Sequence, residues 1–568
     1  MKTNRLPIFI VALVCSYLLS GLPVLCQNSK PKNKDGFAWN GGLTGGFYFQ
    51  DASASNNIAA FNYSVGANVN LSYKKLSIPL SYTYRERTGS FSSPFSRLGI
   101  APKYKWVKLY LGHNTLNFNP YILSGMQMNG IGIELSPGKF RVAYLRGEIK
   151  NTKIIIDSLL NHSGIVNPFQ RNVTAVKIGY GGQYNYFEMQ MITGSDIDKL
   201  TQFQDVADAF KREANTVLGS SLGFALFKNK LSFKANTAVS AFTYNQDGPA
   251  ISEEDFNDNA ILRSINSLIK VNQTTGSYFA GDAQLILRLG TFNVGGKYQR
   301  IDPFYQSFGV FFMRNDVENY TLNGGLSLFR SRLNLSGSWG LNKNNLRKQR
   351  NNQTTQKVYN FQVSMNPVSF AGLDVQISNF SFNQEPLIAD VDDSLKLVQV
   401  NKVNSFNPHF TFGGSVYAHN IYLNYNQQTL TDITNVAEFN NESEIKSYSF
   451  NYNLRNKVKK FTISGNFYHT NTIFSALQRS KTGAVLSFGK NLINNTLNTR
   501  LKLNYSINSQ DEAESKPQYN VSLNTTYTHQ KKINISVQFL YGKRPNFQLN
   551  SQLSDVRISG QINYIINH

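Results

Sequence analysis

The chain has 568 residues, a formal net charge of +23 and a mean hydropathy of −0.32. Beyond the N-terminal residues no stretch approaches about 18 consecutive apolar residues, which argues against a transmembrane helix. Only two cysteines are present, Cys15 and Cys26, which excludes a disulfide-stapled fold for the rest of the chain. A polar mean hydropathy does not exclude a membrane β-barrel, because lumen-facing polar residues cancel lipid-facing apolar ones.

Residues 1–26 have the layout of a secretory signal peptide. An apolar run from about Leu6 to Leu19 follows a basic start, and small residues come after it. Val24 and Cys26 suit the −3 and −1 subsites, which predicts cleavage after Cys26 and a mature chain without cysteine. A lipoprotein cysteine at Cys26 is disfavoured, because Leu25 precedes it where a small residue is usual. A short basic segment, residues 27–36, follows.

From about Phe37 to Ile566 the sequence repeats segments in which apolar and polar residues alternate. Successive side chains of a β-strand point to opposite faces, so each segment would have one apolar and one polar face. Residues 533–541 read INISVQFLY, and residues 497–507 and 556–566 follow the same pattern. The segments run for roughly 10–14 residues, against about 5–6 for an average globular strand. Such long alternating strands are typical of a barrel in lipid.

These features predict an all-β fold: one large closed antiparallel transmembrane β-barrel over residues 37–568. We expect about 24 strands, with a range of about 20–26. Only a closed sheet satisfies every backbone polar group in hydrocarbon, which explains strand length, alternation and the lack of cysteine together. A soluble sandwich or propeller would use shorter strands and denser Gly and Pro turns.

Three stretches interrupt the strand pattern. Residues 198–214 and 252–270 have helix-like apolar spacing, and residues 385–396 form an acidic segment. We interpret all three as long loops on the outer side, with short helices in the first two, that fold over or into the pore. Residues 91–106, FSSPFSRLGIAPKYKW, are interpreted as a folded-in loop leading to a strand.

The stretch RIDPFYQSFG begins at Arg300. Arg300 and Asp302 lie two residues apart and so share a strand face, where they could pair within the lumen or at its rim. Pro303 would end the strand, because proline cannot donate to the ladder. The structural interpretation is a turn that anchors a loop to the barrel wall, and the functional one is a constriction or gate.

Basic residues lie on the polar faces of several predicted strands, at Lys234, Arg500, Lys502 and Arg557. They could line the lumen, where rings of Lys or Arg favour anions. Basic loops could instead bind lipopolysaccharide phosphates, or the charge could serve solubility beside an anionic leaflet. Nucleic-acid binding is not expected, because the basic residues are spread through the strands rather than gathered in one patch.

No constellation for catalysis or metal binding is evident. None of the seven histidines pairs with another at metal-ligand spacing, and no cysteine outside the first 26 residues can assist. The sequence around His529, THQKK, has Lys531 where the outer-membrane phospholipases carry their serine. Acidic pairs such as Asp392–Asp393 are more simply a solvated loop than a calcium site. We therefore expect no enzyme activity and no cofactor.

Residues 97–149, which begin RLGIAPKYKWVKLYLG, are unlike generic barrel sequence, as are residues 298–346 and 361–386. In these blocks the chain resembles a family of large outer-membrane β-barrel proteins of Bacteroidota that has no assigned biochemical role. The resemblance implies an outer-membrane location, a single barrel domain and no catalytic residue. In size the barrel is also similar to TonB-dependent receptors, but too few residues precede the first strand for a plug domain.

The leading functional hypothesis is a monomeric outer-membrane channel for small polar solutes, anions among them. The alternative is a structural or assembly barrel, plugged by its own loops, that serves a surface or secretion complex. Expected partners are outer-membrane lipids and lipopolysaccharide, and a periplasmic or surface protein under the alternative. An open lumen would favour the first hypothesis and a filled lumen the second.

Overall fold

The computed structural model describes residues 36–567 except 53–60, 86–94, 151–152, 158–161, 168, 199–210, 253–265, 267, 270, 311–312, 350–351, 387–396, 433–441, 475–476, 512–514 and 547–550. The predicted signal peptide lies outside the described residues. Within them, no helix is long and apolar enough to cross a membrane.

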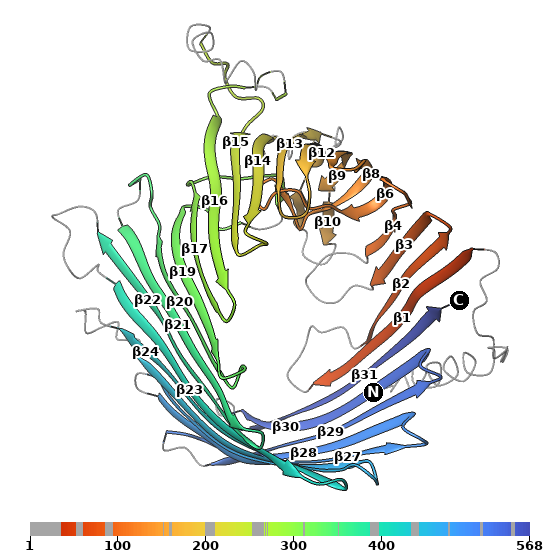
Figure 1. Ribbon diagram of the computed structural model, residues 1–568, viewed down its shortest axis with the longest axis vertical. Helices are drawn as coiled ribbons and strands as arrows, with labels where there is room; N and C mark the ends of the chain where they lie inside the picture. The colour runs from red at the N-terminus through yellow and green to blue at the C-terminus, as the bar shows by residue number, and fades with distance from the viewer. Residues whose placement is uncertain are drawn as a thin grey trace.

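The described part of the chain forms one closed antiparallel β-barrel (Figure 1). Each wall strand pairs antiparallel with its neighbours, and the first strand pairs with the last from Asn40↔Asn567 to Ala52↔Asp555, which closes the ring. The sheet contains 27 described strands. Two of them, β4 and β5, lie end to end between β3 and β6, so the wall has 26 strand positions. The predicted fold class is confirmed, with the strand number at the top of its range.

The wall strands are β1 (Phe37–Ala52), β2 (Phe61–Tyr73), β3 (Leu76–Arg85), β4 (Phe95–Ile100), β5 (Lys103–Tyr104), β6 (Val107–Thr115), β8 (Gln127–Leu135), β9 (Phe140–Lys150), β12 (Phe169–Gly181), β13 (Tyr186–Asp198), β14 (Ala214–Leu226), β15 (Leu231–Thr243), β16 (Thr275–Leu289), β17 (Phe292–Ile301), β19 (Val317–Leu328), β20 (Leu333–Lys343), β21 (Asn352–Val368), β22 (Ala371–Pro386), β23 (Leu397–Gly413), β24 (Tyr417–Asp432), β25 (Ser443–Asn456), β26 (Phe461–Phe474), β27 (Leu477–Leu492), β28 (Leu497–Gln510), β29 (Lys516–His529), β30 (Ile533–Asn546) and β31 (Ser551–Asn567). Four short strands lie outside the wall: β7 (Leu123–Ser124), β18 (Gly309–Val310), β10 (Lys153–Asp157) and β11 (His162–Asn167).

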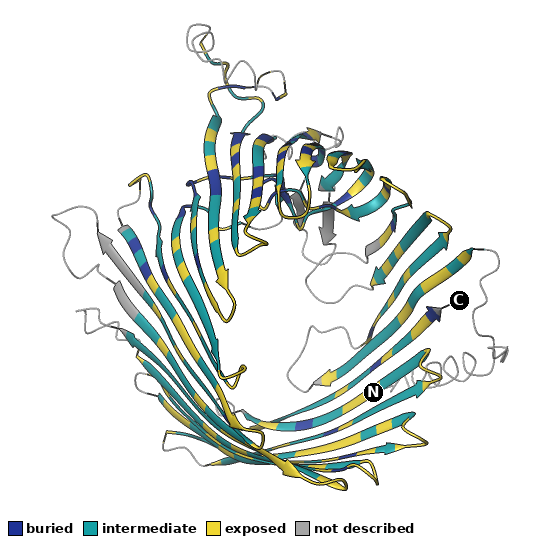
Figure 2. Cartoon of the chain, in the orientation of Figure 1, coloured by how far each residue is buried: buried dark blue, intermediate teal, exposed yellow. Residues whose placement is uncertain are grey.

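Strand alternation gives the wall an apolar and a polar face. In β30 the apolar residues Val537 and Phe539 pair with Thr525 and Leu523 of β29 on one face, where they are 43% and 37% exposed. On the other face Gln538 pairs with Ser559 of β31. Figure 2 shows this alternation of exposed and less exposed residues along the strands. The apolar face points outward, as it must where lipid surrounds the ring.

The two ends of the barrel differ. At one end turns of two to four residues join the strands, and the described wall both begins there, at Phe37, and ends there, at Asn567. At the other end most connections are longer, and the longest, between β15 and β16, has 31 residues. We call these the turn end and the loop end.

The structure tests only one of the expectations about the segments that interrupt the strand pattern. The two predicted helices fall largely on residues 199–210 and 253–265, and the acidic segment on residues 387–396, all outside the described residues. The interpretation of residues 91–106 as a folded-in loop is wrong from Phe95 onward. There β4 and β5 pair with β3 and β6 and belong to the wall, and only the residues at Ala101 and Pro102 break the strand.

Candidate functional site: the barrel lumen

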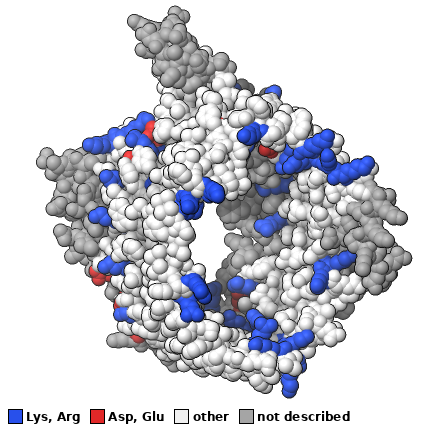
Figure 3. All heavy atoms as spheres, in the orientation of Figure 1, with Lys and Arg blue, Asp and Glu red and all other residues white. Residues whose placement is uncertain are grey.

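The enclosed space is a passage with polar walls. Barrels of about 16–18 strands already leave an aqueous channel, so wall side chains alone cannot fill one of 26 positions. Figure 3 shows an opening through the ring, with Lys and Arg around it. The passage is the candidate functional site.

Two connections at the loop end fold into the lumen. The first joins β6 to β8 and carries β7, and the second joins β17 to β19 and carries β18. Although the two segments are about 180 residues apart, β7 and β18 pair in parallel, through Gly309↔Leu123 and Val310↔Ser124. We call the described residues 116–126, 302–310 and 313–316 the inward loop pair.

Side-chain hydrogen bonds join the two inward loops to each other and to the wall. The Tyr305 hydroxyl donates to the carbonyl of Tyr121 at 2.9 Å, and the Ser307 hydroxyl donates to the carbonyl of Ile122 at 2.7 Å. Gln299 of β17 donates to the Tyr121 hydroxyl at 2.9 Å. Because Gln299 lies on the polar face of its strand, these contacts identify that face as the inner one.

The inward loop pair covers an apolar core on the inner wall of β6–β17. Ile122, Leu123 and Tyr305 are almost fully buried among small and aliphatic wall residues such as Ala175 and Val217. Burial raises the pKa values of Tyr305 and Tyr121 above the ordinary range of tyrosine, so both hydroxyls stay protonated and neutral at physiological pH. In Figure 2 the buried residues gather on this side of the ring. A core of this kind holds the loops as part of the wall.

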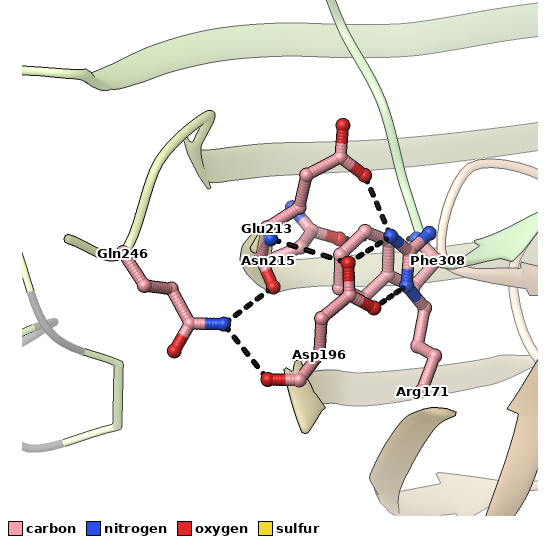
Figure 4. A network of polar contacts seen from close by, with 6 residues as sticks. All are labelled: Arg171, Asp196, Glu213, Asn215, Gln246 and Phe308. Carbon is pink, nitrogen blue, oxygen red and sulfur yellow. Dashed lines mark hydrogen bonds and ion pairs between the residues drawn. The ribbon is translucent and has the colours of Figure 1, made fainter. Parts of the chain in front are cut away.

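A buried charge cluster holds the second inward loop (Figure 4). Arg171 of β12 pairs with Asp196 of β13 at 2.7 Å and with Glu213 at 2.6 Å. Its guanidinium lies 3.6 Å from the centre of the Phe308 ring, and Phe308 donates its backbone N–H to Asn215. Since the Arg171 and Asp196 side chains are only 12% and 2% exposed, the pair is desolvated, and each charge depends on the other.

Asp302 anchors the start of the same loop. It is buried, and its carboxylate accepts the backbone N–H of Phe279 at 3.2 Å and pairs with Arg300 at 3.2 Å and Arg347 at 3.3 Å. β17 ends at Ile301, before Pro303. The anchoring turn predicted from the sequence is therefore the arrangement observed.

Arg300 lies on the outer face of the wall. It pairs in register with Gly281 and Glu318, and its neighbour Tyr298 donates to Glu318 at 2.9 Å beside Tyr320. The inner face at this level belongs to Gln299 and Ile301. Arg300 therefore lies at the outer rim and not in the lumen, because adjacent residues of a strand point to opposite faces.

The inner face of β27–β31 is basic and lies across the passage from the inward loop pair. Arg500, Lys502 and Arg557 all lie on this face, together with Arg544. Lys502, Arg544 and Arg557 line a hollow of 330 Å³ with Asp555, which pairs with Arg557. Among the described residues, no carboxylate pairs with Arg500, Lys502 or Arg544. This surface, which we call the basic wall, therefore presents uncompensated positive charge to the lumen.

Lys234 lies on the inner face elsewhere. It pairs with Gly223 and Gln284, on the same face of β15 as Asn236 and Ala238, two and four residues on. It is exposed and lies toward the turn end of its strand. The structure thus brings Arg500, Lys502 and Arg557 together on β28 and β31 and leaves Lys234 apart from them.

The sequence did not identify the inward loop pair or the Arg171 cluster. Both depend on pairings between residues far apart in the chain, 25 and 42 residues for the two Arg171 contacts. The available signal was composition: residues 117–123, NFNPYIL, and 304–310, FYQSFGV, are apolar and aromatic but do not alternate. Among the described residues, no three His, Cys, Asp or Glu side chains gather as a metal site requires.

No family model matches the chain, and no curated protein matches it. Several solved barrels are similar in structure. The translocation pore of the P pilus usher PapC has a TM-score of 0.38 at 10% identity, over 93% of this chain and 99% of that one. OccK10 of Pseudomonas aeruginosa has a TM-score of 0.34 at 8% identity, over 64% and 97%. OccAB3 of Acinetobacter baumannii has a TM-score of 0.33 at 8% identity, over 70% and 99%. The barrel assignment itself rests on the strand pairing of this chain.

Proposed function

We propose that this barrel is a monomeric outer-membrane channel for small polar solutes, with a preference for anions. The observation that carries the proposal is the basic wall facing an open passage. Rings and rows of Lys or Arg lower the energy of an anion in a pore relative to a cation. Excess positive charge on a low-dielectric wall also concentrates anions near it.

The inward loop pair defines the opposite side of the path. Solutes would pass between the buried core under β7 and β18 and the side chains of β27–β31. Because Arg500 and Lys502 are exposed to solvent, each would bind an anion weakly, and together they would not form one tight anion site. Weak, repeated sites allow an ion to leave as well as enter.

The proposal also assigns a partner to each face of the barrel. The apolar outer face would contact outer-membrane lipids and lipopolysaccharide, and the polar inner face only water and solute. Neither a nucleic acid nor a catalytic group enters the proposed mechanism.

Reconstitution of the purified barrel in a planar bilayer tests the proposal. Under a potassium chloride gradient the reversal potential should show chloride preference. The triple variant Arg500→Gln, Lys502→Gln, Arg557→Gln should lose most of that preference while it still conducts. Lys490→Gln is the matched control, because Lys490 pairs with Phe461 on the outer face and should leave the reversal potential unchanged. A folded barrel that does not conduct, or cation preference in the parent protein, would sink the channel proposal.

The alternative, a self-plugged assembly barrel, is favoured by one observation, the fixed core under the inward loop pair. If the parent barrel is silent but becomes conductive when residues 303–315 are replaced by a short Gly-Ser linker, the loops act as a plug. The search for a periplasmic or surface protein partner would then take precedence over solute assays.

A further inference from the structure

The short turns at the turn end of the barrel carry charge of one sign only. The short turns contain Lys or Arg at thirteen positions and contain no Asp or Glu. These cations are Lys74, Lys75, Lys105, Lys139, Lys228, Lys230, Arg330, Arg332, Lys457, Lys459, Lys460, Lys531 and Lys532. The loop end, by contrast, has acidic residues among its described positions, Asp247, Asp302, Asp316 and Asp511.

Within the described residues the turn cations have no partner of opposite charge. None of the thirteen forms an ion pair with a carboxylate of a described residue. Their contacts are of other kinds: Lys74 and Lys105 lie over the rings of Tyr73 and Tyr104 at 5.1 and 5.3 Å, and Lys457 donates to the carbonyl of Gly414. The positive charge of this end therefore remains available to a ligand outside the chain.

Apolar residues stand beside these cations at the tips of the turns. Phe227 and Phe329 are each 73% exposed, and Ile493 and Val458 are each 66% exposed. Trp106, next to Lys105, is 47% exposed. Side chains of this size expose apolar surface to water only at a cost, unless something outside the chain covers them.

Three of these turns hold the apolar residue in the same unusual backbone conformation. Phe227, Phe329 and Ile493 have φ of 52°, 51° and 48°, and the next two residues in each turn also have positive φ. Bulky residues rarely adopt the left-handed region. A glycine or asparagine would suit these positions better for folding alone, so backbone geometry does not account for the bulky side chains at the turn tips.

Hydrogen bonds fix the shape of these turns. Lys230 and Arg332 each donate their backbone N–H to the carbonyl of the first turn residue, Phe227 and Phe329, at 3.3 Å. The carbonyl of the last turn residue can also accept an N–H from a strand further along the ring. Arg288 of β16 donates its N–H to the carbonyl of Lys230 at 2.7 Å. The apolar tips thus project from an ordered frame.

We propose that the turn end is a binding surface for anionic phospholipid headgroups. The apolar tips would lie at the boundary of the acyl chains, and the Lys and Arg side chains would reach the phosphates, as amphipathic side chains do at membrane surfaces. Because cations and apolar tips recur from turn to turn around the ring, they match the surrounding leaflet better than one compact acidic protein. The proposal is independent of whether the lumen conducts.

Trp106 offers a local probe of this surface. The chain has three tryptophans, so Trp39→Phe and Trp339→Phe leave Trp106 alone. The barrel is reconstituted in phosphatidylcholine vesicles that contain a minority of phosphatidylglycerol, with bromine on the chains of one lipid or the other. Phosphatidylglycerol should quench Trp106 more than its mole fraction predicts, and the excess should fall as salt is raised.

Charge variants separate the proposal from general lipid contact. Lys74→Gln, Lys75→Gln, Lys105→Gln and Lys139→Gln remove the cations around Trp106, where Ser136 also donates to the Trp106 carbonyl. They should lower the phosphatidylglycerol excess several-fold, with an upper bound of about fivefold per cation. The matched variant Lys228→Gln, Lys230→Gln, Arg330→Gln and Arg332→Gln alters distant turns and should leave Trp106 unchanged. Equal quenching by both lipids, or an excess that the local variant preserves, overturns the proposal.

Discussion

At the scale of single residues, one glycine, Gly309, permits the two inward loops to pair closely inside the lumen. β7 and β18 approach each other at Gly309, where an added Cβ would meet the carbonyl oxygen of Ile122 at 2.2 Å and the Ile192 side chain at 2.8 Å. A distance of 2.2 Å is far inside van der Waals contact, and its partner is backbone that cannot rotate away. Only glycine allows the two inward loops to pair at this point.

We expect Gly309→Ala to separate β7 from β18 without unfolding the barrel. Hydrogen exchange measured by mass spectrometry should show faster exchange in residues 119–125 and 305–310, while the wall strands keep their protection. Gly296→Ala in β17 is the control, because nothing lies within 4 Å of its Cβ position. Unchanged exchange in the inward loops of Gly309→Ala would contradict the close approach.

At the scale of the strand, alternation determines what each side chain meets. Phe539 and Leu540 are adjacent in β30 and similar in hydrophobicity, but Phe539 pairs with Leu523 on the outer face and Leu540 pairs with Arg557 on the inner face. Leu540 lines the hollow of the basic wall, where water is available. The same chemical change should thus have different costs at the two positions.

We expect Phe539→Arg to lower the free energy of unfolding by about 2–4 kcal/mol, the cost of a cation on the lipid face near the bilayer midplane. Leu540→Arg should cost far less, because its guanidinium reaches the solvated lumen. Urea unfolding from lipid vesicles, followed by tryptophan fluorescence, compares the two variants. If Leu540→Arg proves the more destabilising of the two, the inner and outer faces have been assigned the wrong way round.

At the scale of the whole molecule, closure depends on a contact between the two ends of the described chain. β1 and β31 are separated by nearly the full sequence, and Tyr48 pairs with Ser559 on the inner face of their seam. In the described wall closure leaves no edge strand, and this is what permits the sheet to remain in a membrane.

A cysteine pair tests this seam. In the chain lacking residues 1–26, which has no other cysteine, Tyr48→Cys with Ser559→Cys should form a disulfide, because directly paired residues bring their Cβ atoms within the reach of one. The change should appear as a shift in mobility on a non-reducing gel. Tyr48→Cys with Asn563→Cys, four residues along the same face, should not cross-link. Efficient cross-linking of this offset pair would mean a different register.

By itself the sequence determined the architecture. Alternation in segments such as residues 533–541 is a local property, because successive side chains of a strand must point to opposite faces. It therefore predicted the closed barrel, the apolar outer face and the inward position of Lys502 and Arg557. The turn after Ile301 was also local, since Pro303 cannot continue a strand.

Only the tertiary structure decided which segments enter the lumen and which charges meet. The inward loops, about 180 residues apart in the chain, pair through β7 and β18. Arg171 pairs with Asp196 and Glu213 only when β12 and β13 are in register. Arg300 shares a sequence motif with Asp302 yet lies on the outer face, because Asp302 lies beyond the end of β17 and does not follow the alternation of that strand. Long-range pairings of this kind leave no periodic trace in the chain, so the character of the lumen becomes visible only when the ring is closed.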